Sequence, residues 1–430
     1  MKNAIIFLFA VSILGSCTIK NKAIVSEKYI DSLLAISTLS KYEQGIKADL
    51  SFWKNKYKAD PESATFAQKY AGMLVSNFQI YGNINDLILA ESIIEKLNSL
   101  QTNTDSGICR NLANYAGLQH QFTKAYTFAN IASQIGDNQY FSQLLLFDAA
   151  FELGKMDQAK TILNKIKKKY EYAYYFRLAK MKHYDGDLEA AQMAMETAIQ
   201  LSNSNVYLQQ KSLSNLADLQ LHNGDYEAAS QNFIKSLALD HADFHSLKGL
   251  GLIAQNYDKN YKLAQLIFDH LAQKTKAPDI YFNLTSLAQA QGNKTAELKY
   301  AQLFAEKASQ KTYGNMYNKY LIELFEGSLN DSKAMLTVCE NEIKIRNTPQ
   351  TNAWYAWALH QNFQKEKALT IYNKQVKEKP LEGLELYFMS KMMLLEKKEN
   401  LAKLYSKAAY KNRFELMPNS KNELEKTINI

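Results

Sequence analysis

The stretch from residue 213 to residue 241 most strongly limits what this chain can fold into. Its sequence, LSNLADLQLHNGDYEAASQNFIKSLALDH, contains two apolar patterns separated by a short turn. In the first half, apolar residues recur at the spacing of an amphipathic helix, and these are Leu213, Leu216, Ala217 and Leu221. In the second half, the same spacing predicts a helix with one buried stripe, formed by Tyr226, Ala229, Phe233 and Leu237.

The turn between the two predicted helices indicates how they pack. Gly224 tolerates the left-handed backbone conformation that ends a helix, where a residue with a Cβ atom would be strained. Asp225 follows at the N-cap position, where its carboxylate can accept hydrogen bonds from free N–H groups of the next helix. Ala217 and Ala229 are small, so the helix axes can cross closely. The stretch is therefore predicted to form a tight helical hairpin.

This order of residues resembles the tetratricopeptide repeat, a helix-turn-helix unit of about 34 residues. The residues that carry the resemblance are Leu216, Ala217, Gly224, Asp225, Tyr226, Ala229 and Phe233. The sequence departs from the family at Leu213, where a large aromatic residue is usual, and at His241, where Pro is usual. The resemblance implies that repeats stack with their first helices along a concave groove and their second helices on the convex back.

Imperfect copies of this unit recur along the chain. Turn glycines stand at Gly154, Gly186, Gly224 and Gly292, each followed by small and large apolar residues at helical spacing. We therefore predict an all-α fold, an α-solenoid of stacked tetratricopeptide-like helix-turn-helix repeats. The expected parts are an N-terminal helical cap (26–60), nine or ten helix pairs (61–415) and a polar C-terminal tail (416–430) that caps the array or frays.

The N-terminus reads as a targeting segment. Lys2 precedes an apolar run, residues 4–14, that is too short to span a bilayer as a helix. The run leads into Leu14-Gly15-Ser16-Cys17, which resembles the bacterial lipobox. The resemblance implies a lipoprotein signal peptide (1–16), acylation of Cys17 as an anchor to the membrane, and a flexible tether (17–25). The alternative is an ordinary signal peptide followed by a chance Cys.

The residues after Cys17 bear on where such a lipoprotein would reside. Thr18 follows the Cys, whereas an Asp there would favour retention in the inner membrane, so the outer membrane is expected. The Lys-, Asn- and Tyr-rich composition resembles envelope proteins of Bacteroidetes. In that group an acidic run after the Cys favours the cell surface, but residues 18–22 are basic. We therefore expect the bacterial outer membrane, on its periplasmic face.

Composition excludes some partners. The formal net charge is +8, from 51 Lys and Arg against 43 Asp and Glu, and the Lys residues are spread along predicted helix surfaces. No Arg-rich stripe or nucleic-acid module is visible, so no nucleic-acid partner is expected. Cys109 and Cys339 lie far apart in a presumed elongated solenoid, so we expect two small buried residues rather than a disulfide.

No catalytic signature is present in the sequence. It has no Gly-rich phosphate loop, HExxH, nucleophile elbow or CxxC, so we predict a protein that is not an enzyme and needs no cofactor. His241 and His245, near Asp240 and Asp243, have the spacing of a helical metal site. They fall where two repeats join, however, and need not share a helix, so no metal site is predicted.

The function implied by the family resemblance is binding of a protein or peptide partner in the groove. Groove positions can be projected from each turn glycine, and they are Asp148, Phe151, Phe176, Lys180, His183, Ser214, Asp218, His245, Lys248, Phe282 and Gln289. Their mixed charge, with aromatic residues between, favours a polypeptide over a nucleic acid. We predict a non-catalytic, membrane-anchored scaffold or adaptor in the bacterial cell envelope.

Aromatic residues leave a second function open. Side chains that could stack on sugar rings are Tyr172, Tyr174, Tyr175, Trp354 and Trp357. Outer-membrane starch-utilisation lipoproteins also carry tetratricopeptide repeats, but they have long insertions between repeats that this chain lacks. The alternative is therefore a glycan-binding outer-membrane lipoprotein of a polysaccharide-uptake system.

Overall fold

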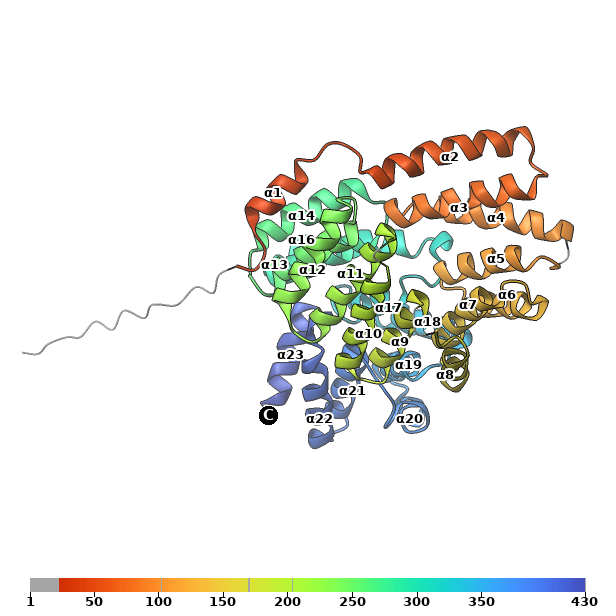
Figure 1. The fold of residues 1–430 in the computed structure, drawn as a ribbon. Helices are drawn as coiled ribbons and strands as arrows, with labels where there is room; N and C mark the ends of the chain where they lie inside the picture. Colours follow the sequence, from red (N-terminus) through yellow and green to blue (C-terminus); the bar gives the residue numbers. More distant parts are fainter. Residues whose placement is uncertain (1–22, 102, 169–170, 203, 430) are drawn as a thin grey trace, which may run out of the picture.

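The computed structural model describes residues 23–101, 103–168, 171–202 and 204–429 (Figure 1). The expected signal peptide, the acylated Cys17 and all but the end of the expected tether lie outside these residues. Every regular element within the described residues is helical. The structure is thus an all-helical stack of helix pairs.

Two helices precede the repeats, α1 (Glu27–Leu34) and α2 (Lys41–Ala59). Ten helix pairs follow within the described part of the chain, and their bounds are α3 (Ala64–Tyr81) with α4 (Ile84–Gln101), α5 (Ser106–Leu118) with α6 (Phe122–Ile135), α7 (Gln139–Glu152) with α8 (Met156–Lys165), α9 (Tyr172–Tyr184) with α10 (Leu188–Leu201), α11 (Val206–His222) with α12 (Tyr226–Leu239), α13 (Phe244–Asn256) with α14 (Tyr261–Lys274), α15 (Asp279–Ala290) with α16 (Lys294–Ala308), α17 (Asn318–Glu326) with α18 (Ser332–Ile345), α19 (Pro349–Gln361) with α20 (Lys365–Ile371), and α21 (Gly383–Leu395) with α22 (Glu399–Lys411). The remaining elements are η1 (Lys311–Tyr313), η2 (Tyr372–Val376), η3 (Arg413–Glu415) and a last helix, α23 (Pro418–Ile428).

The hairpin of α11 and α12 forms as its sequence predicts. Gly224 adopts a φ of +78°, in the left-handed region, directly after α11. The Asp225 carboxylate caps α12 by accepting the Ala228 N–H at 3.0 Å. Ala217 and Ala229 are both fully buried where the helices cross. The turn and the small residues therefore shape the repeat itself.

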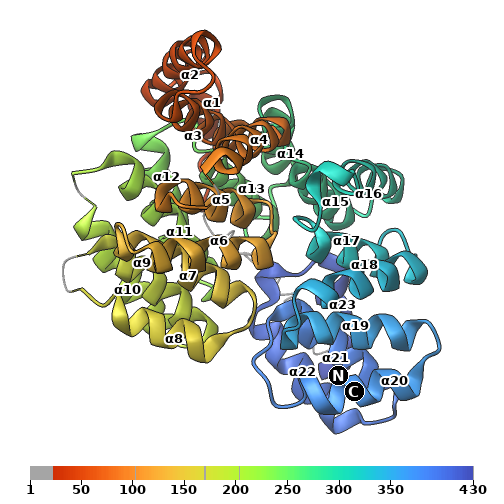
Figure 2. The same cartoon turned by 90° about the vertical axis from the view of Figure 1, so that its right-hand side faces the viewer.

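The stacked pairs coil into a superhelix whose successive turns touch (Figures 1 and 2). The Lys276 N–H donates to the Tyr81 carbonyl at 2.8 Å, which joins the end of α14 to the end of α3. Further along the chain, Arg346 lies 3.5 Å from Glu152 at the end of α7. The expectation of an elongated solenoid is therefore wrong, because residues about 190 positions apart bond directly across the turns.

Both ends of the described chain pack on the solenoid. The Ile24 and Val25 N–H groups donate to the Asp258 carboxylate at 2.8 and 3.0 Å, and Val25 is buried. The expected flexible tether therefore ends before Ile24. The expected polar tail begins with an extended stretch, in which Leu416 and Met417 are buried, and continues as α23, in which Leu424 is buried.

Two further features of the described chain concern its cysteines and the length of its helices. Cys109 and Cys339 are both free and buried. No helix of the described residues is long and apolar enough to cross a bilayer.

Candidate functional site: the inner surface and the inter-turn cleft

The predicted groove residues lie on the first helices of five consecutive repeats, α7 to α15. Most of the charged ones are bonded to the first helix of an adjacent repeat. The pairs are Asp148 with Arg177, Lys180 with Glu152 (2.7 Å), Asp218 with His245 (2.8 Å) and Lys248 with Asp279 (2.7 Å). The carboxylate of Asp218 raises the pKa of His245. These residues therefore tie repeats together as well as facing the interior.

The uncharged groove predictions differ in their exposure. Ser214 is 2% exposed and donates its hydroxyl to the Lys211 carbonyl, so the prediction that it faces a partner is wrong. Three aromatic residues pack in ring clusters: Phe151 on Tyr184, Phe176 on Tyr172, and Phe282 on Phe304 and Tyr320. The projection from a turn glycine gives a position along the helix, but it does not give the exposure of that position.

The inner surface is divided into small cavities by contacts between turns. Phe151, Lys180 and His183 line a cavity of about 300 Å³, which Arg346 and Lys319 close from the opposite turn. A second cavity, of about 270 Å³, is lined by His245 and Lys248 and closed by Tyr317 and Tyr320. These predicted residues do lie on the inner surface, where they line more than one cavity.

A charge network joins opposite sides of the interior. The ammonium group of Lys319 lies 3.1 Å from Glu382 and 3.7 Å from Glu415. Glu415 also lies 2.8 Å from His222. Although burial opposes it, the positive charges of Lys319 and His222 lower the pKa of Glu415. Burial raises the pKa of the neighbouring Glu385, whose carboxylate accepts the Trp354 indole N–H.

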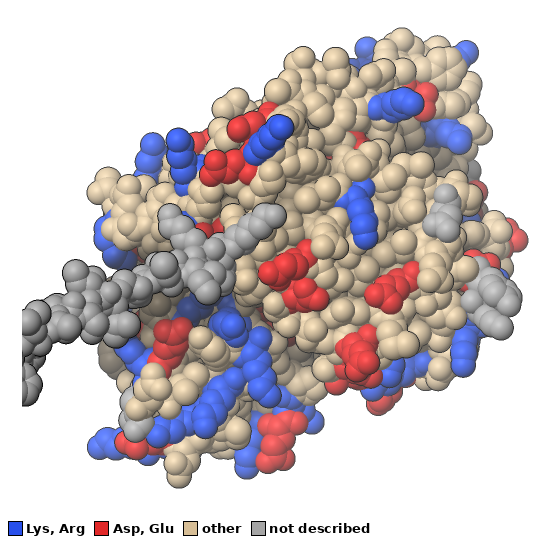
Figure 3. Space-filling view, turned by 60° about the vertical axis from the view of Figure 1, so that its left-hand side comes forward, with Lys and Arg blue, Asp and Glu red and all other residues tan. Residues whose placement is uncertain are grey.

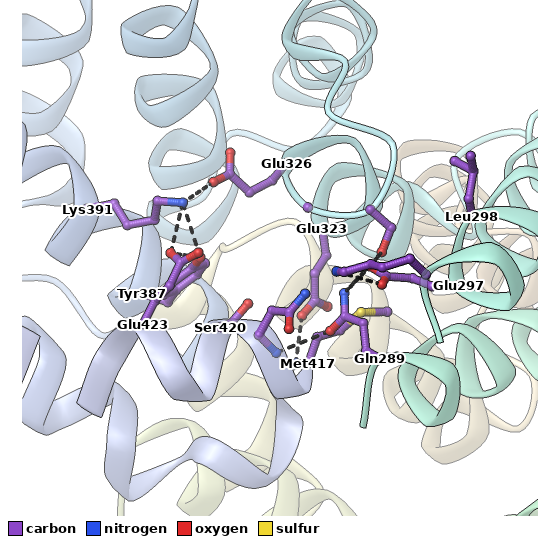
Figure 4. Close-up of a pocket in the computed structure, with 14 residues that line it drawn as sticks. Gln289, Glu297, Leu298, Glu323, Glu326, Tyr387, Lys391, Met417, Ser420 and Glu423 are labelled. Atoms are coloured by element: carbon purple, nitrogen blue, oxygen red, sulfur yellow. Dashed lines mark hydrogen bonds and ion pairs between the residues drawn. The ribbon is translucent and has the colours of Figure 1, made fainter. Parts of the chain in front are cut away.

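Residues 413–421, which we name the C-terminal segment, contact the ends of several first helices, and Figure 4 shows Met417 close to Gln289 and Glu323. Four polar side chains near the ends of α11, α13, α15 and α17 hold the segment. We name them the polar ladder, and they are His222 on Glu415 (2.8 Å), Asn256 on Lys421 (3.0 Å), Gln289 on the Asn419 N–H (3.2 Å) and Glu323 on the Met417 N–H (3.2 Å). They stand 34, 33 and 34 residues apart, one repeat period each.

The inter-turn cleft is the largest open space on the molecule among the cavities described. It has a volume of about 970 Å³ and separates the ends of α9 and α11 and the start of α10 from α21, α22 and η3. Its lining includes His183, Leu188, His222, Leu381, Leu386, Leu404, Lys407, Lys411 and Arg413. Figure 3 shows Lys and Arg side chains gathered on the C-terminal part of the molecule, below the base of the grey trace.

The inter-turn cleft has an excess of positive charge. Its three acids are neutralised by cations of the chain: Asp185 by Lys160, Glu382 by Lys319, and Glu415 by His222. Its exposed cations Lys407, Lys411 and Arg413 make no ion pair with any residue that the structure describes. The charge they carry is therefore free to meet a partner.

Comparison with known proteins supports the repeat assignment. A model of the family described as tetratricopeptide repeat matches residues 172–205 and 210–243, the two hairpins α9 with α10 and α11 with α12. The chain therefore contains tetratricopeptide repeats.

Other comparisons add little to this assignment. Among solved structures, the crystal structure of yeast Tom70 is similar to 87% of this chain and 96% of its own, with 14% identity and a TM-score of 0.35. This overlap is too loose to support an argument about shape or function. A comparison with curated proteins found no match. Tetratricopeptide repeats are typically non-catalytic scaffolds that bind protein or peptide partners.

The described residues support neither a metal site at His241 and His245 nor a sugar-binding surface on Trp354 and Trp357. His241 precedes α13 and faces the Thr38 carbonyl at 3.0 Å, whereas His245 lies within α13 on Asp218. No metal-binding cluster of His, Cys, Asp or Glu occurs among the described residues. Trp354 and Trp357 are 2% and 0% exposed, so they cannot stack on a glycan.

The sequence-based projection of groove residues includes neither the complete polar ladder nor the basic residues of the inter-turn cleft. The polar ladder could have been found by comparing positions 34 residues apart near each turn. The basic wall of the cleft could have been found from the six Lys and Arg in residues 397–413. Nothing in the sequence pattern indicates, however, that α22 would lie opposite the ends of α9 and α11, since that depends on the superhelical winding.

Proposed function

We propose that this protein is a lipid-anchored, non-catalytic scaffold of the bacterial cell envelope that holds an acidic polypeptide segment in the inter-turn cleft. The observation that carries the proposal is the cleft itself, where Lys407, Lys411 and Arg413 lack ion-pair partners beside exposed or half-exposed leucines. Tetratricopeptide repeats supply the rigid frame for such a surface. An acidic segment would neutralise the three cations.

The lining favours a polypeptide over other polyanions. Leu188, Leu381, Leu386 and Leu404 supply an apolar surface among the cations. Aliphatic side chains of a peptide would bury this surface, whereas a nucleic acid is bound by a uniformly basic groove with aromatic stacking platforms. A partner segment that alternates acidic and aliphatic residues fits both features.

The anchor part of the proposal rests on residues 14–17 and on the start of the folded chain. Leu14-Gly15-Ser16-Cys17 resembles a lipobox, and acylation of Cys17 would anchor the chain to a membrane. Asp258 holds Ile24 and Val25 against the solenoid. Six residues lie between Cys17 and Ile24, and the seven Cα-to-Cα steps that join the two reach at most about 25 Å. The solenoid would therefore sit close to the bilayer, which we place at the periplasmic face of the outer membrane.

The anchor is tested by replacing Cys17 with Ala. The variant is expected to lose incorporation of labelled palmitate and to leave the membrane fraction for the soluble envelope fraction. Ser16→Ala, which keeps a small residue before the Cys, is the matched control and is expected to behave as the unaltered protein. A Cys17→Ala protein that remains processed and membrane-bound would overturn the anchor.

The cleft is tested by charge reversal at two exposed positions. We expect Lys407→Glu with Lys411→Glu to reduce recovery of the partner polypeptide from detergent extracts at least tenfold, because two cations of the cleft become acids. The matched control reverses Lys54 and Lys56, which are equally exposed on α2. Equal recovery with both double variants would exclude the inter-turn cleft as the binding surface.

A further inference from the structure

The C-terminal segment is bound in the way that a scaffold binds a separate peptide. Leu416 and Met417 have extended backbones, with ψ values of 150° and 153°. The N–H group of Met417 is accepted by the Glu323 side chain, and that of Asn419, in the first turn of α23, by the Gln289 side chain. Side chains of a rigid groove that bond an extended backbone recognise a peptide largely through its main chain.

Each side chain of the segment has its own place on the inner surface. Phe414 lies against Tyr226, with ring centroids 6.1 Å apart. Glu415 bonds His222, as described above. Leu416 and Met417 are 3% and 4% exposed and belong to two different apolar clusters, one around α19 and α21 and the other around α16 and α17. Four successive residues thus meet four distinct environments.

The spacing of the polar ladder shows that successive repeats build the site from equivalent positions. His222, Asn256, Gln289 and Glu323 occupy equivalent positions in four consecutive repeats, and each contacts residues 413–421. One period separates Glu323 from Trp357, and a second leads to Lys391, which lies 3.1 Å from Glu423 just beyond the segment. Equivalent positions on successive repeats form the continuous binding surface of a solenoid.

The fit of the segment in this site is incomplete. A cavity of about 390 Å³ remains beside it, bordered by Gln289, Glu323 and Met417 (Figure 4). One carboxylate oxygen of Glu415, Oε2, is buried without a hydrogen-bond partner, and the Lys319 ammonium lies 3.7 Å from it. Burial also lowers the pKa of Lys421 to about 8 and raises the pKa of Glu323 to about 7, so both charges are held at a cost. A better-fitting segment could therefore compete with this one.

We propose that the polar ladder is a binding site for a polypeptide segment of a partner, with an aromatic residue, an acid and two apolar residues in succession, and that residues 413–421 occupy it as an internal ligand. The order is that of Phe414, Glu415, Leu416 and Met417. The site adjoins the inter-turn cleft, since His222, Arg413 and Glu415 also line that cleft, and it rests on the proposed function only in treating the chain as a polypeptide-binding scaffold.

A peptide-binding measurement with the full chain tests this site. The probe is a fluorescein-labelled peptide with the sequence of residues 411–421. We expect it to bind the full-length variant Leu416→Ser/Met417→Ser at least tenfold more tightly than it binds the unaltered chain, because the variant weakens the internal ligand. Replacing Gln289 and Glu323 with Ala in that variant should abolish the gain. A control peptide with Ser in place of Glu415, Leu416 and Met417 should not bind.

Hydrogen exchange of the unaltered chain gives a second test that needs no variant. The amides of Met417 and Asn419 are expected to exchange at least a hundredfold faster than those in the middle of α21, since an internal ligand opens without unfolding the repeats. Equal exchange rates would mean that the segment is permanent core and would overturn the proposal. So would a folded Leu416→Ser/Met417→Ser chain that does not bind the peptide. Neither measurement requires the lipid anchor or the inter-turn cleft, so a failure here leaves the proposed function standing.

Discussion

Glu323 shows how one buried carboxyl group links pH to the stability of the interior. Burial raises its pKa from the ordinary 4.5 to about 7, and its carboxylate accepts the Met417 N–H. An acid whose pKa is raised on folding stabilises the fold below its unfolded pKa, and this contribution is lost as pH rises through the folded pKa. The stability of the chain should therefore fall between about pH 4.5 and pH 7.

Replacing Glu323 with Gln isolates this contribution. The amide oxygen can still accept the Met417 N–H, but no charge is buried at high pH. We expect the loss of unfolding free energy between pH 5 and pH 8 to be smaller in the variant by about 3 kcal/mol, measured by urea denaturation at both pH values. The same pH dependence in both proteins would show that Glu323 is not buried as described.

Gly249 makes a close helix crossing possible. A Cβ atom at this position of α13 would overlap the ring of Phe233, a fully buried side chain of α12. We expect Gly249→Ala to lower the free energy of unfolding by about 1–3 kcal/mol through overpacking, although Ala normally favours a helix. Gly72→Ala in α3 is the matched control, because nothing lies within 4 Å of its added Cβ, and it should raise stability by about 1 kcal/mol. Thermal denaturation of both variants measures the contrast, and equal effects would contradict this crossing.

Single residues that shape the repeat could be predicted from sequence, whereas single residues that bind could not. Gly224, Asp225 and Ala229 act through contacts with residues close in sequence, so their roles follow from local rules. The position of Ser214 in its repeat predicts that it faces a partner, but the side chain is buried. The exposure of a side chain in a coiled solenoid also depends on contacts between residues far apart in the sequence, and rules for local structure do not predict these.

At the scale of elements, one side chain accepts the first two backbone N–H groups that hold the N-terminal part of the described chain on the solenoid. Asp258, in the turn between α13 and α14, accepts both the Ile24 and the Val25 N–H groups. We expect Asp258→Ala to release residues 24–25 and α1, because two backbone donors lose their acceptor. Limited proteolysis should then cut within residues 23–40 several times faster than in the unaltered chain. Asp269→Ala, on the exposed side of α14, is the control, and cleavage at equal rates in the two variants would contradict the assigned anchor.

Helix pairs were predictable because each pair carries its own apolar pattern and turn. The last element, α23, was expected as a polar tail, and its sequence from Pro418 is indeed mostly polar. Its apolar contacts are few, and the apolar residues that matter most, Leu416 and Met417, precede it in an extended stretch. A periodicity test for helices does not detect such a segment.

At the scale of the whole molecule, the winding of the superhelix decides which surfaces stay open. Contacts such as Tyr81 with Lys276 and Glu152 with Arg346 close the interior into cavities. The same winding places α22 opposite the ends of α9 and α11 and leaves the inter-turn cleft between them. The repeat fold could be predicted from the sequence. The superhelical winding could not, because it is a sum of small rotations between repeats and does not depend on any single residue.

Site-specific cross-linking in cells most directly tests the claim that the inter-turn cleft holds a partner polypeptide. A photoreactive phenylalanine at position 404, where Leu404 is 63% exposed in the cleft, should form a polypeptide adduct, and the same group at position 52, where Phe52 is 50% exposed on α2, should not. Lys407→Glu with Lys411→Glu should reduce the adduct at position 404 at least tenfold. The absence of a polypeptide adduct at position 404, or an adduct unaffected by these charge reversals, would contradict the account.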